Sequence, residues 1–150
     1  MTLQHLLRIG RVKVHVPATA EVQRLLSAID RNLADAEVPG ISDDTRFDVA
    51  YKAVMQCALV ALLAAGYRPA TSEPGHHQTM IQSLPLTLGV DNEAWVVLDA
   101  LRRLRNASDY TGKPITTSAT AECIAQATAL RARLRAHLQA HHRALLKKPE

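Results

Sequence analysis

Aromatic residues are scarce in this sequence, which has one Trp, one Phe and three Tyr among 150 residues. Alanine, by contrast, occurs 24 times. Sheets favour aromatic and β-branched side chains, whereas alanine has the highest helix propensity. The composition therefore predicts an all-α fold. Because only the short segment 11–16 is rich in strand-forming residues, no sheet is expected.

Glycine and cysteine are also few, with six and two residues. No glycine-rich turn joins a strand to a helix, which excludes P-loop and dinucleotide-binding sites. Cys57 and Cys123 lie far apart and form no CxxC pair, so a redox pair and a structural zinc site are not expected. Both cysteines are predicted to be buried thiols, typical of a reducing compartment. The sequence predicts neither a cofactor nor a metal site.

A long hydrophobic run is absent as well. The longest apolar stretch, residues 53–65, has 13 residues and contains Gln56. A membrane-spanning helix needs about 20 apolar residues. The basic N-terminal segment is not followed by an apolar signal region, so secretion is not expected. We therefore expect a cytoplasmic protein without a membrane partner.

The helical pattern predicts one domain over residues 1–150, with residues 1–16 as an N-terminal arm. Apolar residues spaced by three and four, together with capping residues, predict four long helices and one short helix. The long helices are expected over residues 18–37, 43–66, 91–109 and 117–146, and the short one over residues 76–84, ending before Pro85. Short connections favour an up-and-down bundle. The 43–66 helix, which is apolar nearly all round, is expected at the centre of the core.

The net charge of +4 is unevenly distributed along the chain. Residues 1–16 carry +3, residues 17–100 carry −6, and residues 101–150 carry +7. A basic region of this kind favours a phosphate-rich partner. The alternative is that these Lys and Arg side chains only solvate the outer faces of two helices.

The segment 101–112 is the densest group of polar residues beside an apolar stripe. Arg105 lies one helical turn after Leu101, so its side chain is expected on the inner side of the helix. Asp109, four residues on, could pair with it, with Tyr110 covering the pair. Alternatively, Arg105, Asn106 and Arg102 form an anion site, because the guanidinium fork fits phosphate and carboxylate groups.

Two histidine groups offer further candidate sites. His76 and His77 open the short helix, where unpaired backbone N–H groups attract anions; they could line a functional pocket or merely cap the helix. His137 and His141 share a helix face, which is a spacing that can hold a metal. Without the Glu of the zinc-protease motif, a solvated basic helix end is the favoured interpretation.

Several stretches, taken in order, resemble the HEPN family of small helical bundles found in prokaryotic toxins, in defence systems and beside nucleotidyltransferases. The stretches are Leu6 to Arg11, Asn32 to Ala36, Arg46 to Tyr51, Gly75 to Gln78, and Arg105-Asn106 before Asp109-Tyr110. The resemblance implies a homodimer that brings together two copies of a motif: an Arg, usually followed by a polar residue, and then a His after four to six intervening residues. Catalytic members of the family cut RNA with this motif without a metal.

The match to that motif is partial. Arg105 and Asn106 match its first half, and Tyr110 stands at the first position open to the His. The resemblance implies Arg105, Asn106 and Tyr110 as candidate catalytic residues, and Arg102, Arg105, His76 and His77 as candidate RNA or phosphate ligands. A phenol with a pKa near 10 is a poor general base at neutral pH.

Two functions follow as hypotheses. The first is a homodimer that binds RNA or nucleotide phosphate in a basic groove between its subunits, with degenerate or weak ribonuclease activity. The second is a noncatalytic interaction module that pairs with a nucleotidyltransferase or another regulatory partner. The basic C-terminal third and the Arg105-Asn106 pair favour the first, and the missing His favours the second.

Overall fold

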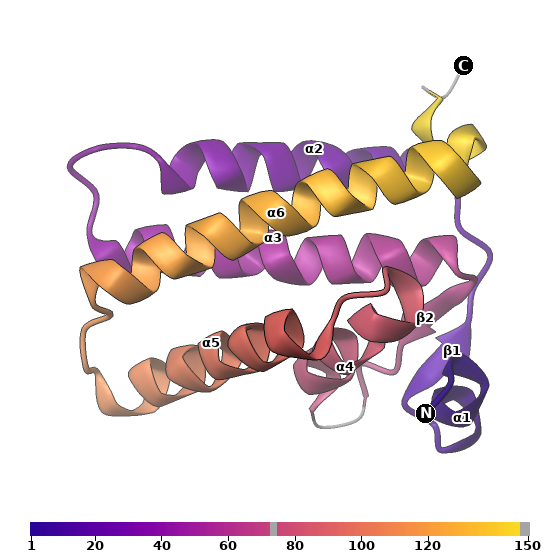
Figure 1. Cartoon of the computed structure of the whole chain (residues 1–150), viewed down its shortest axis with the longest axis horizontal. Helices are drawn as coiled ribbons and strands as arrows, with labels where there is room; N and C mark the ends of the chain where they lie inside the picture. The colour runs from indigo at the N-terminus through magenta and orange to yellow at the C-terminus, as the bar shows by residue number, and fades with distance from the viewer. Residues whose placement is uncertain (73–74, 148–150) are drawn as a thin grey trace.

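A computed structural model describes residues 1–72 and 75–147 and is mostly helical, which confirms the all-α prediction (Figure 1). The elements, in chain order, are α1 (Leu3–Arg8), β1 (Val12–Val14), α2 (Thr19–Ala36), α3 (Asp43–Ala64), β2 (Tyr67–Pro69), α4 (His76–Thr87), α5 (Asn92–Thr111), α6 (Thr117–His141) and the 3₁₀ helix η1 (Arg143–Leu146).

Helix α3 is the centre of the core, as its apolar sequence predicts. Helices α2 and α6 pack along it, while α4 and α5 lie on its other side; α2 and α5 run opposite to α3 and α6 (Figure 1). Within the described residues, α3 alone is long and apolar enough to cross a membrane, and 72% of its apolar window is buried inside the protein. Burial within one chain explains this apolar character without a bilayer.

The starts of α3, α5 and α6 are fixed by side-chain caps. Ser42 accepts a hydrogen bond from the backbone N–H of Thr45 at 3.2 Å, and Asp91 caps α5 in the same way through Ala94 at 2.8 Å. Such caps satisfy backbone donors that a helix leaves unpaired in its first turn. They place α5, and therefore Arg105, in a defined register.

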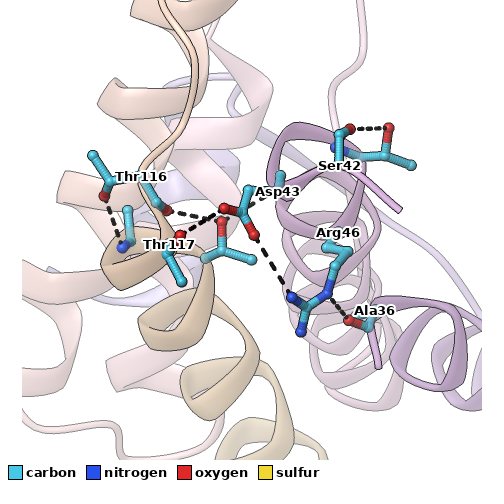
Figure 2. A network of polar contacts seen from close by, with 9 residues as sticks. Ala36, Ser42, Asp43, Arg46, Thr116 and Thr117 are labelled. Atoms are coloured by element: carbon cyan, nitrogen blue, oxygen red, sulfur yellow. Dashed lines mark hydrogen bonds and ion pairs between the residues drawn. The ribbon is translucent and has the colours of Figure 1, made fainter. Parts of the chain in front are cut away.

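A polar network ties three helix ends together, as Figure 2 shows. The Thr117 hydroxyl at the start of α6 donates to Asp43 Oδ2 at 2.8 Å at the start of α3. Arg46 lies 3.6 Å from Asp43 and donates through Nε to the carbonyl of Ala36, the last residue of α2, at 2.7 Å. These contacts join the ends of α2, α3 and α6, and none of their residues lines the pocket that contains His77.

The expectation of no sheet is wrong. Strands β1 and β2 pair antiparallel, with Lys13 opposite Arg68. Each strand has only three residues, and Val12 is buried in a small cluster with Leu6 and Leu62. Tertiary packing, which local composition does not record, stabilises the pairing. The expected N-terminal arm therefore contains both α1 and β1.

Two helix ends also differ from the prediction. Helix α4 continues through Pro85 to Thr87, because the last turn keeps its bond from Leu88 N to Leu84 O at 2.9 Å and buries Leu84. Proline removes one N–H donor, and the packed helix tolerates this loss. Helix α6 ends at His141, and the predicted extension to residue 146 is a separate 3₁₀ turn.

Candidate functional site

Helices α3, α4 and α5 together line a pocket of about 460 Å³. Its polar residues come from all three helices: Asp48, Tyr51, Lys52 and Gln56 from α3, His77 from α4 and Arg105 from α5. Its apolar lining consists of Val49, Met55, Leu59 and Met80. A few convergent polar groups on an apolar floor are typical of a ligand-binding pocket.

Arg105 lies at the α5 side of the pocket, with its guanidinium carbon 5.0 Å from the centre of the Tyr51 ring. Its nearest carboxylate oxygens are distant, at 3.9 Å in Asp48 and 4.0 Å in Asp109. Charge-assisted hydrogen bonds are about 2.7–2.9 Å long. The expected Arg105–Asp109 pair is present but loose, and Arg105 Nε is buried without a hydrogen-bond partner. The guanidinium therefore retains donors for an anion.

His77 faces Arg105 across Tyr51. Its Nδ1 lies 3.3 Å from the Tyr51 hydroxyl, and the ring of His76 stands edge-on at 4.7 Å. Burial lowers the pKa of His77, and the charges of His76, Arg105 and Arg102 lower it further. The imidazole is therefore neutral at pH 7. A neutral imidazole can accept a proton or bind a phosphate through an N–H group.

The pKa values of Tyr51 and Asp48 are both raised, which favours the neutral form of each side chain. Burial raises the pKa of Tyr51 to about 12, although Arg105 and Arg102 act in the opposite direction. Burial also raises the pKa of Asp48, with Arg105 opposing it. Tyr51 thus carries its hydroxyl proton throughout the physiological range.

Arg102, an expected phosphate ligand, lies outside the pocket lining and is held by Asp99. Its Nε donates to Asp99 Oδ1 at 2.9 Å, and the two side chains are only 14% and 7% exposed. Arg103 reaches the other oxygen of Asp99 at 3.0 Å. Arg102 acts on the pocket through its charge, which lowers the pKa of His77 and opposes the rise of the Tyr51 pKa.

The other predicted residues are separated from Arg105 in different ways. Asn106 is exposed, and Tyr110 is 91% exposed and does not cover the Arg105–Asp109 pair. His76 lies beside His77 but lines an adjoining pocket. Of the predicted set, Arg105 and His77 line the pocket between α3, α4 and α5, while His76 and His77 line the adjoining pocket. Sequence reasoning missed Tyr51 as a site residue; it lies between Asp48 and Lys52, just before the apolar stretch 53–65, and nothing local marks it as part of a pocket.

The histidines at the end of α6 form a second cluster. The rings of His137 and His141 are 5.0 Å apart, and those of His137 and His142 are 5.4 Å apart. Burial lowers the pKa of His137, as do His141 and His142. Across residues 1–72 and 75–147, no group of three or more His, Cys, Asp or Glu side chains is arranged to hold a metal ion. Cys57 and Cys123 are buried, as predicted.

A comparison with protein families, curated proteins and solved structures found no match to this chain.

Proposed function

We propose that this chain is a HEPN-like helical bundle that binds the phosphate groups of RNA or of a nucleotide in the pocket between α3, α4 and α5. The observation that carries this proposal is the presence of Arg105 and His77 in one pocket, on either side of Tyr51. The Arg105 fork supplies charge-assisted donors to phosphate oxygens. The apolar lining offers a surface for a base or a ribose.

A weak, metal-independent cleavage of RNA fits the same residues. His77, neutral at pH 7, would take the proton of a ribose 2′-hydroxyl, whose oxygen then attacks the adjacent phosphorus. Arg105 would stabilise the charge that develops on the phosphoryl oxygens. The bond to the 5′-oxygen breaks, and that oxygen takes a proton from water. Because His77 comes from α4, it would replace the His that the α5 motif lacks.

We also propose that the protein is a cytoplasmic homodimer with the pocket in a groove between the subunits. The support is the exposed surface of α5, the helix that carries Arg105, where Val96, Leu104 and Tyr110 are apolar or aromatic side chains open to solvent. Light scattering at micromolar concentration tests this proposal. We expect about twice the chain mass of 16.4 kDa. A monomer that persists on concentration would reject the shared groove.

Fluorescence anisotropy with a labelled single-stranded RNA tests the phosphate site. We expect binding at low salt that weakens as salt rises, because cationic side chains release counterions from phosphates. Arg105→Ala should abolish binding, whereas Arg31→Ala, an exposed arginine on α2, serves as the matched control. Absence of binding at low salt would reject the proposal.

The second candidate is a noncatalytic module that pairs with a nucleotidyltransferase. It is favoured by one observation, the position of Asn106 and Tyr110 outside the pocket on the exposed side of α5. Under this hypothesis the chain forms a stable complex with a co-expressed nucleotidyltransferase and binds no RNA at low salt. Tyr110→Ala should then weaken the complex, whereas Arg105→Ala should not.

A further inference from the structure

A second pocket, of about 370 Å³, adjoins the first and shares Leu59, His77 and Met80 with it. Because they share these three residues, the two pockets lie side by side with His77 between them, and the pair is called the two-pocket groove. The second pocket is bounded by parts of the chain that are distant in sequence, from the segment before α2 to the start of α4. Its remaining lining is His15, Glu21, Leu25, Leu63, Arg68, Pro69, Thr71 and His76.

The floor and the rim of the second pocket differ in chemistry. The floor is apolar, with leucines from α2 and α3 beside Pro69 and Met80. The rim is polar, and Glu21 is its fixed element: Oε1 receives a hydrogen bond from Ala18 N at 3.0 Å and lies 2.7 Å from His15 Nε2. An apolar floor with a rigid hydrogen-bonding rim suits a flat nucleobase, which is apolar on its faces and polar at its edge.

Positive charge continues along this end of the groove. Arg68 lines the second pocket from β2, and Lys13 lies directly opposite Arg68 in the antiparallel pair. Side chains that are directly opposite in such a pair share one face of the sheet. Both are exposed, so they are accessible to the phosphates of a strand that leaves the groove.

Resting on the proposed function above, we infer that the ligand is single-stranded RNA that occupies both pockets. The phosphate that links two nucleotides lies beside His77, between the pocket of Arg105 and the pocket of Glu21. The second pocket takes the neighbouring base, and Arg68 contacts the phosphate beyond it. Each pocket lies within the range of about 300–1,000 Å³ that holds a small ligand, so each has room for one nucleotide. Unstacked bases enter such pockets from single strands, whereas bases in a duplex remain stacked.

The test compares a six-nucleotide single-stranded RNA with a nucleoside monophosphate in low salt, by anisotropy for the RNA and by NMR titration for the monophosphate. Arg68→Ala and His15→Ala alter only the second pocket, Arg105→Ala alters the first, and Arg31→Ala is the control. Arg31 lies ten residues beyond Glu21 on α2, which places it about 15 Å away along the helix axis.

We expect Arg68→Ala to weaken binding of the six-nucleotide RNA about tenfold, the scale of one charge-assisted contact, while leaving monophosphate binding unchanged. His15→Ala should act in the same direction, because it removes the partner that fixes Glu21. Arg105→Ala should weaken the binding of both ligands.

If Arg68→Ala and His15→Ala bind the RNA as tightly as the wild type does, the two-pocket inference is overturned, whereas the phosphate site at Arg105 is unaffected. If neither ligand binds the wild type, the proposed function itself fails. Equal affinity for the same RNA in a duplex would also overturn the inference.

Discussion

The hydroxyl of Tyr51 on α3 lies 3.3 Å from Nδ1 of His77 on α4. Because burial keeps the Tyr51 phenol protonated, it can donate to a bare Nδ1 or accept from a protonated one. In either case Nδ1 is occupied, and within the described part of the chain Nε2 makes no hydrogen bond, so Nε2 is the nitrogen that a ligand can use. The contact therefore orients the imidazole before any ligand arrives.

Tyr51→Phe should release His77 from this orientation without unfolding the protein. The ring of residue 51 still stacks on Phe47, and the loss of one hydrogen bond costs about 1 kcal/mol. We expect nitrogen NMR of the histidines to show one tautomer of His77 in the wild type and a mixture in the variant. RNA affinity should fall less than in His77→Ala. A single unchanged tautomer in Tyr51→Phe would mean that the hydroxyl does not position His77.

The lowered pKa of His77 predicts a loss of stability in mild acid. The unfolded chain binds the proton near pH 6.5, whereas the folded chain binds it only at lower pH. The contribution of His77 is therefore fully present above about pH 6.5 and is lost as the pH falls from there toward the folded pKa. Thermal melts over this window should show a shallower pH dependence in His77→Gln.

His137→Gln provides the comparison, since burial lowers the pKa of His137 as well. It should also flatten the stability profile in mild acid, but it lies outside the pocket and should leave RNA affinity unchanged. An identical pH dependence in wild type and His77→Gln would show that the protonation of His77 does not differ between the folded and unfolded states.

Arg105→Ala should abolish ligand binding while lowering the free energy of unfolding by about 1 kcal/mol or less. The two carboxylates nearest to Arg105 lie 3.9 and 4.0 Å away and are more than half exposed, at 58% for Asp48 and 55% for Asp109. Exposed ion pairs of this kind contribute little to the free energy of unfolding. Asn106→Ala should leave binding unchanged, because Asn106 is exposed and lies outside the pocket lining. Arg105→Lys should be intermediate, because it keeps the charge but not the fork.

Paired denaturation curves and RNA titrations of these variants separate the two hypotheses for Arg105. A large loss of stability with unchanged binding per folded molecule would make Arg105 a structural residue.

Asp99→Ala should be far more destabilising than changes in the pocket. Arg102 would be left mostly buried without its carboxylate, and breaking a buried ion pair costs about 3 kcal/mol or more. Arg103→Ala is the matched control, because Arg103 contacts the same Asp99 but is 74% exposed and should cost less than about 1 kcal/mol. Chemical denaturation measures both. Similar losses in the two variants would contradict a buried role for Asp99.

The sequence predicted the long helices well because their signals are local. Ser42, Asp91 and Thr116 mark helix starts, and the apolar surface of α3 identifies the central helix. The β1–β2 pair was missed because the burial of Val12 depends on Leu62, fifty residues away. The predicted end of the helix before Pro85 was wrong because it also ignored tertiary packing. The burial of Leu84 outweighs the loss of one backbone N–H donor at Pro85.

The residues of the candidate site also differ in whether local sequence signals or only tertiary packing identifies them. Arg105 could be singled out from its helical spacing, because Leu101 and Asp109 lie on the same helix. Its juxtaposition with His77 could not, because it depends on how α4 packs between α3 and α5. Local signals therefore singled out two residues of the pocket, Arg105 and His77, and tertiary packing supplied their juxtaposition and the rest of the lining.

The cluster of Leu6, Val12 and Leu62 is separate from the main core, and this separation has a consequence for motion. A small cluster of its own allows α1 and β1 to detach as a cooperative unit, at a lower free energy than global unfolding. Because β1 holds β2, which carries Arg68 into the groove, detachment would loosen one wall while α2, α3 and α6 stay folded. A ligand that bridges both pockets therefore slows amide hydrogen exchange in β1, a strand whose backbone it need not touch.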